Sequence, residues 1–440
     1  MDRLVEDSPS QWQEWVRSRV DEHAPLWKGI LHPLMPAQIA RLLLRVCALQ
    51  RCVFLNRVLP PSVTAAPMRA FDYDLLVVLS KVLQLPSPLP VEAMFTLCEP
   101  ISQGGEGFRR MDSITHLAYY SSTAQYFRHL VRCLPRPDVP EYAIPSLQSL
   151  AVCLAHLQDD SGLVGNSKFE SLVPPLGSGP ATFFGLFQLV APRHIQRLLT
   201  HWREAVARKV LRAPGEHLLS KAIRLSCSGR NAGAALTTLP LCALTTSTDR
   251  EVIHQVRLRL RLPPSDRMPA VCPGCGQDLI ADPHHWLSCA HLVGAIRIFR
   301  HNLFMKVHFL SLMGCAISVE PRIQGFADQA DILVVFPSGS RYLIDVRVPT
   351  PSCKSHILRA QVPGAVALHD EAAKSLKHGA QAAAAGAKLV PFVIEAYGTF
   401  GAEAHAFVHD MAKEIVEVTR RFGSDIMVAA MRAEITSTQG

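Results

Sequence analysis

Apolar residues recur at helical spacing through the first part of the chain. Between residues 36 and 58 they stand three or four positions apart, which predicts a helix that ends before Pro60-Pro61. A second helix is predicted over residues 68–85, where a run of prolines follows. Proline clusters bracket another helical stretch at residues 147–157. The first half of the chain is therefore expected to be all-helical.

The pattern changes in the last third of the chain, where short apolar runs alternate with helical periodicity. The predicted order is a helix (296–313), three strands (316–323, 331–336 and 342–348), a helix (368–385), a strand (389–396) and a helix (402–422). The segment Pro337-Ser338-Gly339-Ser340 is a natural hairpin turn between the second and third strands. We therefore expect a mixed sheet flanked by helices.

These patterns predict an α+β protein with a helical N-terminal half and an α/β core near the C-terminus. With 440 residues, the chain is too long for one ordinary core. The expected divisions are a helical region (1–150), a helical linker with basic faces (151–265), a zinc knuckle (266–292), the α/β core (293–425) and a tail (426–440).

Composition and charge narrow the class of protein. The net charge of +8 favours an acidic partner such as nucleic acid, and 48% hydrophobic residues indicate a folded chain. The first residues lack the apolar run of a secretory signal, and the longest apolar stretches are far too short to cross a bilayer. We expect a soluble, intracellular protein, in which cysteines are free core residues or metal ligands.

One cysteine cluster has the spacing of metal ligands. Cys272 and Cys275 stand on a tight Cys-Pro-Gly-Cys turn, and His285 and Cys289 complete a Cys₃His set. His284 is the alternative histidine ligand, and whichever of the two does not ligate is expected to face solvent or a phosphate. The other interpretation is that four unmetallated residues fall together by chance. Four protein ligands leave no open position for a substrate, so the predicted zinc is structural.

Basic residues precede this cluster. Arg257, Arg259 and Arg261 alternate with leucines, a pattern that fits either a strand or a helix. In either case we expect them to hold a phosphate backbone. The stretch 192–225 is also basic and amphipathic, and it is either a solvated face or a second contact to nucleic acid. The segment Gly104-Gly105-Glu106-Gly107 has no preceding strand and no lysine in the phosphate-loop position, so a turn is predicted there.

Two acids stand in otherwise apolar strands after the knuckle. Asp331 opens one predicted strand and Asp345 lies inside the next, so a hairpin brings both carboxylates to one end of the sheet. Magnesium or manganese needs such oxygen ligands. Asp328 is an alternative to Asp331, and Glu320 is a further candidate carboxylate. The structural interpretation of the same residues is an aspartate at a turn and an Asp345 paired with Arg347.

Hydrolysis of a phosphodiester also benefits from a fixed cation. The candidates are Arg347, on the same strand face as Asp345, and Lys374 and Lys377 on the following helix. Lys377 is preferred, because lysine can also orient or deprotonate a water.

At these residues the chain resembles the C-terminal part of non-LTR retrotransposon proteins that carry a restriction-like endonuclease. The matching positions are Cys272, Cys275, His285 and Cys289, Arg300-His301-Asn302, Ala330-Asp331, Asp345-Val346 and Lys377-His378. The first half is similar to the thumb that follows the polymerase core of those proteins, through Arg57-Val58-Leu59-Pro60-Pro61, Phe71-Asp72, Gly104-Gly105-Glu106-Gly107 and Ser228-Gly229 to Leu239-Pro240. Ala330 and His378 depart from the family's proline and tyrosine.

The resemblance implies a thumb-like N-terminal region, a CCHC zinc knuckle and a PD-(D/E)xK endonuclease core that nicks DNA in the nucleus. Asp331 and Asp345 would hold magnesium or manganese, and Arg300 and His301 would contact DNA. Element RNA is a second expected partner. The sequence contains no Tyr/Phe-x-Asp-Asp motif, so polymerase activity is expected from a separate chain. The alternative functions are a catalytically decayed nucleic-acid-binding protein of the same origin and a purely helical interaction protein.

Overall fold

The computed structural model describes residues 8–133, 216–241, 245–292, 315–321, 331–336 and 339–422, with residues 149, 152, 153, 196, 197, 200 and 204. The chain divides into two compact units. Unit 1 comprises Met1–Glu99, Gly107–Glu216 and Ser247–Ile253, and unit 2 comprises Pro100–Glu106, His217–Thr246 and His254–Gly440. Unit 1 is helical where it is described, and unit 2 combines helices with a four-stranded mixed sheet. The protein is therefore α+β, as predicted.

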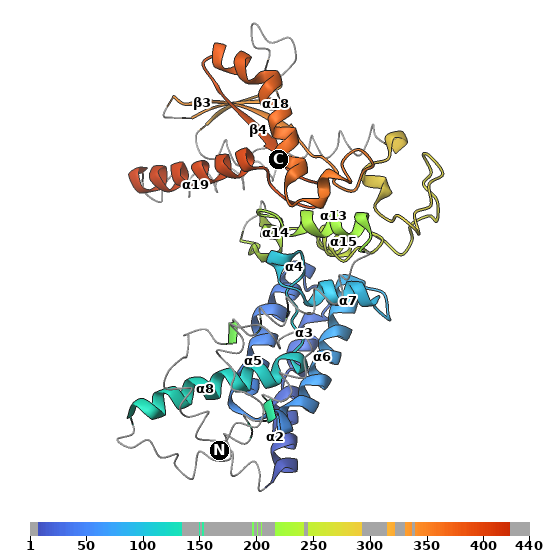
Figure 1. Ribbon diagram of the computed structural model, residues 1–440, viewed down its shortest axis with the longest axis vertical. Coiled ribbons are helices and arrows are strands. Elements are labelled where there is room, and N and C mark those ends of the chain that lie inside the picture. Colours follow the sequence, from blue (N-terminus) through green and yellow to red (C-terminus); the bar gives the residue numbers. More distant parts are fainter. Residues whose placement is uncertain are drawn as a thin grey trace. The chain divides into compact units, whose positions relative to one another are not determined.

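Unit 1 is built from helices, drawn in blue to green in Figure 1. They are α2 (Pro9–Asp21), α3 (Ala24–Ile30), α4 (Ala37–Leu43), the π-helix η1 (Leu44–Ala48), α5 (Leu49–Val58), α6 (Pro61–Leu83), α7 (Val91–Cys98), η3 (Asp112–Ile114) and α8 (Thr115–Cys133). Phe71 is fully buried, and its ring lies 5.2 Å from that of His23 and 5.7 Å from that of Trp27. The helix predicted over 36–58 is confirmed, as is the one predicted over 68–85. The stretch 147–157 and most of 192–225 lie outside the described residues.

Helix α6 begins at Pro61, earlier than its apolar pattern indicated. Proline is compatible with the first position of a helix, because the N–H that it lacks has no intrahelical partner there. Pro60-Pro61 thus ends one helix, as predicted, and also begins the next.

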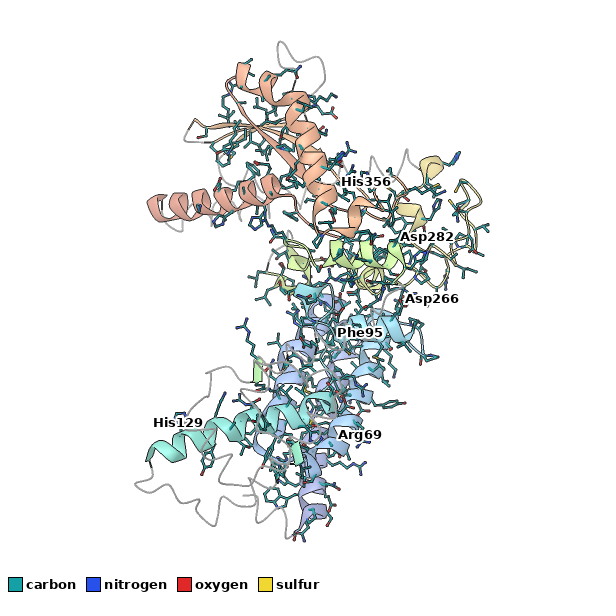
Figure 2. All side chains as sticks on the ribbon, in the orientation of Figure 1. Arg69, Phe95, His129, Asp266, Asp282 and His356 are labelled. Atoms are coloured by element: carbon teal, nitrogen blue, oxygen red, sulfur yellow. The ribbon has the colours of Figure 1, made fainter. Side chains whose placement is uncertain are left out.

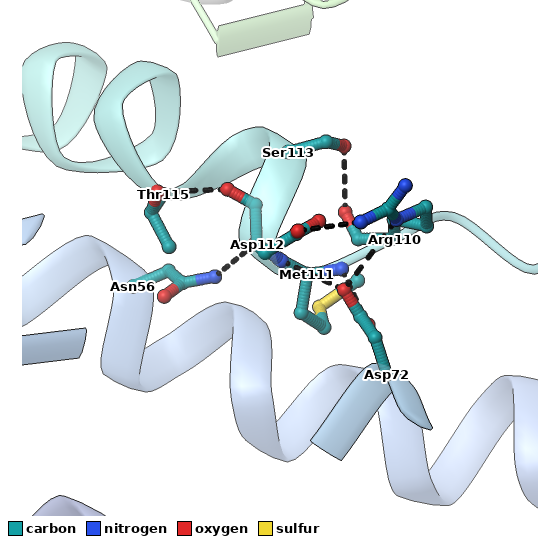
Figure 3. Close-up of polar contacts among 7 residues, drawn as sticks. All are labelled: Asn56, Asp72, Arg110, Met111, Asp112, Ser113 and Thr115. Carbon is teal, nitrogen blue, oxygen red and sulfur yellow. Dashed lines mark hydrogen bonds and ion pairs between the residues drawn. The ribbon is translucent and has the colours of Figure 1, made fainter. Parts of the chain in front are cut away.

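A buried carboxylate joins α6 to the start of α8 (Figure 3). The Asp72 carboxylate accepts hydrogen bonds from the backbone N–H groups of Met111 (2.8 Å) and Asp112 (3.0 Å). Asn56 donates to the Met111 carbonyl at 3.0 Å. Burial raises the pKa of Asp72 to about 7, although the two backbone hydrogen bonds act in the opposite direction. The network therefore positions the turn before α8, and it does so around an acid that is costly to ionise.

The sheet of unit 2 has the strand order β1-β2-β3-β4. Its strands are β1 (Ala316–Val319), β2 (Ile332–Val335), β3 (Arg341–Arg347) and β4 (Lys388–Val393). The first three are antiparallel neighbours, and β3 pairs with β4 in parallel. The connection from β3 to β4 contains α18 (Ala365–Ala384), and α19 (Ala402–Phe422) follows β4. The predicted order of strands and helices is confirmed from β1 onward, whereas the helix predicted over 296–313 lies outside the described residues.

The two helices cover opposite faces of the sheet, because alternate residues of β3 point to opposite sides. Ile344 and Val346 pack in one cluster with Phe407 and Met411 of α19. Leu343, on the other face, packs with Ala382 of α18. Asp345 and Arg347 share the face of Leu343 and so lie beneath α18, where the candidate catalytic residues meet.

Shorter helices complete unit 2. They are η2 (Ile101–Gln103), α13 (Leu218–Cys227), α14 (Ala234–Thr237), α15 (Asp249–Arg259, whose first turns belong to unit 1), η6 (His285–Leu287), η7 (Ala290–Leu292) and η8 (Arg359–Gln361). The glycine-rich segment at 104 is a turn, as predicted, with Gly104 in the left-handed region at φ +89°. Among the described helices, none combines the length and apolar character that a membrane crossing requires.

The Asp72 network predicts a pH dependence of the stability of unit 1. An unfolded aspartate has a pKa of about 3.9, and the folded value is higher. The stabilising contribution is therefore fully present below about pH 4 and is lost as pH rises to about 7. We expect the free energy of unfolding to fall by on the order of 2–4 kcal/mol over this window. Urea unfolding followed by tryptophan fluorescence tests this, because Trp12, Trp15 and Trp27 lie in unit 1.

Asp72→Asn provides the control, because it removes the titrating group and retains one acceptor for the Met111 or Asp112 N–H. The variant should show a smaller change in stability between pH 4 and pH 7 than the wild type. Parallel curves for the two proteins would contradict the assignment of this pH dependence to Asp72.

Candidate functional site

The predicted zinc ligands converge in unit 2. The Cys272 and Cys289 sulfurs are 3.6 Å apart, the Cys289 and Cys275 sulfurs are 3.7 Å apart, and Cys275 Sγ lies 3.0 Å from His285 Nε2. All four ligand atoms lie within 4.8 Å of one another. Zinc–sulfur bonds of about 2.3 Å in a tetrahedron place sulfurs about 3.8 Å apart. The four side chains therefore fit a zinc-type metal.

The local fold explains this convergence. Gly276 N–H donates to the Cys272 carbonyl at 2.8 Å, which closes the turn that carries Cys272 and Cys275. Gly276 has φ +74°, a conformation that L side chains rarely adopt. On the other side, Cys289 N–H donates to the His285 carbonyl at 2.9 Å, so one short turn presents both remaining ligands.

His284 is the other histidine, and the structure separates its role from that of His285. It is only 1% exposed, and its Nδ1 lies 2.9 Å from the Tyr397 hydroxyl. Burial, together with the charge of Arg261, lowers the pKa of His284 to about 4. The expectation that the second histidine faces solvent or a phosphate is wrong, because this side chain fills the interface between the knuckle and the Tyr397 loop.

Further contacts attach the knuckle to the rest of unit 2. Leu287 and Tyr397 share an apolar cluster with Ile223 and Cys227 of α13. The Thr350 hydroxyl donates to the Leu287 carbonyl at 3.2 Å. The knuckle is therefore packed into the same unit as the sheet, and Thr350 lies only a few residues beyond the end of β3.

Two of the three arginines before the knuckle, Arg257 and Arg259, lie on α15, which resolves their helix-or-strand ambiguity in favour of a helix, and both are buried. Arg257 is 2% exposed; its Nε donates to the Pro263 carbonyl at 2.6 Å, and it pairs with Asp266, labelled in Figure 2. Arg259 is 4% exposed and pairs with the buried Glu106 at 2.9 Å. Their predicted contact to a phosphate backbone is wrong, because the protein itself surrounds both guanidinium groups.

Arg259 connects three separate segments of unit 2. Besides Glu106, it donates to the carbonyls of Gly105 at 3.0 Å and of Cys227 and Ala232 at 3.2 Å. Arg261, two residues later, is only partly exposed and adopts φ +61°. The third predicted arginine therefore remains a candidate for binding nucleic acid.

The two aspartates meet across neighbouring strands. Ile332 of β2 is paired with Ile344 of β3, so Asp331 and Asp345 are opposite each other one residue further along the register. The Asp331 carboxylate accepts a hydrogen bond from the Val346 N–H at 2.6 Å. Glu320 is exposed; its N–H donates to the Asp331 carbonyl at 2.7 Å, which places it beside Asp331 through the backbone. The predicted hairpin thus brings the two aspartates to one end of the sheet, and the pairing of β1 with β2 places Glu320 at the same end.

Asp345 is 7% exposed, and two residues of α18 lie against it. Lys374 Nζ is 2.5 Å from Oδ1, and His378 Nε2 is 3.6 Å from Oδ2. Oδ2 is buried and has no hydrogen-bond partner. An unsatisfied buried carboxylate oxygen is costly and therefore needs a further explanation, such as a cation. Lys377, preferred from the sequence, has an exposed side chain, so the structure brings Lys374 to Asp345 instead.

Arg347 pairs with Asp370 of α18 rather than with Asp345. Its Nε lies 2.6 Å from Asp370 Oδ2, and the Asp370 side chain is 1% exposed. Asp370 and His378 were not predicted as site residues. The signal was present in the sequence, because Asp370, Lys374 and His378 recur every four residues and so share one helix face. Arg300, His301, Asp328 and Ala330 lie outside the described residues.

Comparisons with known proteins add no further constraint. No family model matches the chain, and no curated protein matches it. Among the described residues, the zinc set is the one group of three or more Cys, His, Asp or Glu side chains whose ligand atoms gather closely.

The neighbouring histidines permit a matched test of the zinc site. His285→Ala should lower the zinc content from about one ion per chain, because three cysteines leave one tetrahedral position without a protein ligand. His284→Gln should retain zinc and instead lower the melting temperature through loss of the Tyr397 contact. Zinc is measured by mass spectrometry after gel filtration with a weak chelator. Equal zinc loss in both variants would argue against this assignment.

Arg259 should behave as a structural residue. Arg259→Ala leaves Glu106 buried without its partner and should destabilise unit 2 by about 3–5 kcal/mol. Arg259→Met combined with Glu106→Gln removes both charges and should recover much of that loss. Urea unfolding followed by circular dichroism compares the two. If Arg259→Ala instead had wild-type stability and weakened DNA binding, the result would support the predicted contact of Arg259 with a phosphate.

Proposed function

We propose that this protein is a divalent-metal-dependent endonuclease that nicks DNA. The observation that carries the proposal is the environment of Asp345. One carboxylate oxygen is held by Lys374, the other is buried without a hydrogen bond, and Asp331 lies opposite across the strand pair. Two acids and a lysine at one end of a mixed sheet form a set suited to phosphodiester hydrolysis.

The residues present suit a hard cation. Asp345 Oδ2 supplies a buried oxygen that has no hydrogen bond and lies 3.6 Å from His378 Nε2, and Asp331 would supply the second carboxylate. A magnesium or manganese ion bound there would polarise the scissile phosphodiester and lower the pKa of an attacking water. Lys374 is 23% exposed, and one of its three N–H donors engages Asp345. Its remaining donors can orient a water or a phosphate oxygen.

The rest of unit 2 supports this function. The sheet order and flanking helices agree with the core implied by the resemblance to non-LTR retrotransposon endonucleases, and a zinc-type site precedes that core. In those proteins the nick primes reverse transcription. We therefore propose a nuclear protein that acts on DNA and contacts element RNA.

The alternative is a decayed relative that binds nucleic acid without cutting it. One observation favours this alternative, because Lys374 already balances the charge of Asp345. Nicking of supercoiled plasmid by the purified protein, with magnesium or manganese, separates the two functions. Asp331→Ala/Asp345→Ala is the control. If the protein shifts DNA in a gel but does not nick it with either metal, the binding-only alternative is supported.

The two lysines of α18 sharpen the test. Lys374→Ala should lower the nicking rate by about a hundredfold, because a positioned general acid–base group typically contributes 10²–10⁴-fold. Lys377→Ala, on an exposed position of the same helix, should change the rate by no more than about threefold. Single-turnover nicking with saturating protein measures both. A larger loss of nicking rate in Lys377→Ala than in Lys374→Ala would instead assign the catalytic role to Lys377.

A further inference from the structure

A second charged contact lies beside the proposed metal position, on the same face of the same strand. Arg347 is two residues after Asp345 on β3, and its Nε is held by Asp370 of α18 at 2.6 Å. The side chain remains 45% exposed. The contact is an ion pair without hydrogen-bond geometry, and no described residue accepts a hydrogen bond from this guanidinium. Its two terminal nitrogens are therefore available to a ligand that approaches from solvent.

Asp370 is an unusual partner, because it is completely buried and belongs to no apolar or metal cluster described above. Its Oδ2 engages Arg347, and its Oδ1 lies 3.1 Å from His369 Nδ1. The His369 side chain is 49% exposed. One buried carboxylate thus contacts two half-exposed basic side chains, those of Arg347 and His369. A buried charge with two such partners is typical of residues that position other groups.

Other basic groups surround this pair. His356, labelled in Figure 2, lies in the segment between β3 and α18, and Arg359 follows one turn later in η8. Burial lowers the pKa of His356, and the positive charges of Arg347, Arg359 and His369 lower it further, against the opposing charge of Asp370. The basic groups are thus close enough to act on a single imidazole.

We propose that Arg347 and His369 form a phosphate subsite, positioned by Asp370, that holds a phosphodiester neighbouring the one at Asp345. This subsite rests on the proposed function for the identity of its ligand. A guanidinium that is ion-paired through Nε keeps its terminal N–H groups as a fork that matches two oxygens of a phosphate. Asp370 already restricts the conformations of the Arg347 side chain, so less conformational entropy is lost when a phosphate binds.

The spacing supports a strand of nucleic acid as the ligand. Residues two apart on one strand face are about 6.6–6.8 Å apart. This separation is comparable to that of neighbouring phosphates along one strand, so Asp345 and Arg347 can serve successive phosphates. The ligand class is a polymeric phosphodiester rather than a single free phosphate.

Binding of a fluorescein-labelled DNA duplex, measured by anisotropy without added magnesium or manganese, tests the subsite without any nicking. Arg347→Gln should weaken binding about tenfold and lower the slope of log affinity against log salt by about one contact. Arg341→Gln is the matched control, because Arg341 is exposed on the same strand at its opposite end. It should leave affinity and slope near wild type. Equal effects of the two variants would overturn the subsite.

Asp370→Asn tests the positioning role, because two explanations of Asp370 predict opposite changes in DNA affinity. If Asp370 contributes only its negative charge, the variant should bind DNA more tightly. If it positions Arg347, binding should weaken severalfold and should not weaken further when combined with Arg347→Gln. Tighter binding by Asp370→Asn would overturn the proposal. Should this variant fail to fold, His369→Gln at a half-exposed position is expected to weaken binding and replaces it.

Two further measurements separate this inference from the proposed nuclease. Asp345→Asn should lose nicking in magnesium but bind DNA at least as tightly as the wild type when no magnesium or manganese is added, so a failed nicking assay leaves the subsite testable. Inorganic phosphate is the probe for a free-anion site. A phosphate-induced rise in melting temperature that Arg347→Gln abolishes, with no loss of DNA affinity in that variant, would overturn the phosphodiester assignment.

Discussion

Two ion pairs between β3 and α18, each built on a buried aspartate, constrain the candidate site. Asp345 and Arg347 lie on one face of the strand, and Lys374 and Asp370 meet them from the helix. Burying one of these charges without its partner costs several kcal/mol. A shift of the helix along the strand would break both pairs at once. The pairs therefore specify the position of α18, while apolar contacts such as Leu343 with Ala382 supply the burial.

The zinc knuckle also contacts the segments that follow two strands of the sheet. Its metal ligands close a small turn-rich segment that has little apolar core of its own, formed by Cys272, Leu279 and Cys289. His284 and Leu287 then connect this segment to Tyr397 and Thr350. Thr350 closely follows β3, and Tyr397 closely follows β4. Zinc binding is thus expected to stabilise the segments that follow two central strands, which makes it structural in a wider sense than the knuckle alone.

The arginines illustrate why positive charge is a weak indicator of a binding surface. Arg257 and Arg259 are buried ion-pair partners, whereas Arg347 is half-exposed and partly committed to Asp370. All three stand beside apolar residues in the sequence. The difference arises from where the acids Asp266, Glu106 and Asp370 are brought by the fold. Positive charge available to a ligand is the charge that remains after such internal pairing, and it is far smaller than composition indicates.

The sequence by itself determined the zinc ligand set, the order of strands and helices around the sheet, and the convergence of Asp331 with Asp345. Each of these depends on residues close together in the chain, where spacing and turn chemistry dictate geometry. Tertiary structure alone decided which of His284 and His285 joins the cysteine cluster and which of Lys374 and Lys377 contacts Asp345. It also decided that Arg259 is buried rather than exposed. Each choice depends on a partner distant in sequence, namely Tyr397, Asp345 or Glu106. Neighbouring residues of the same type are equivalent in a local pattern, and only packing against a distant segment makes them different.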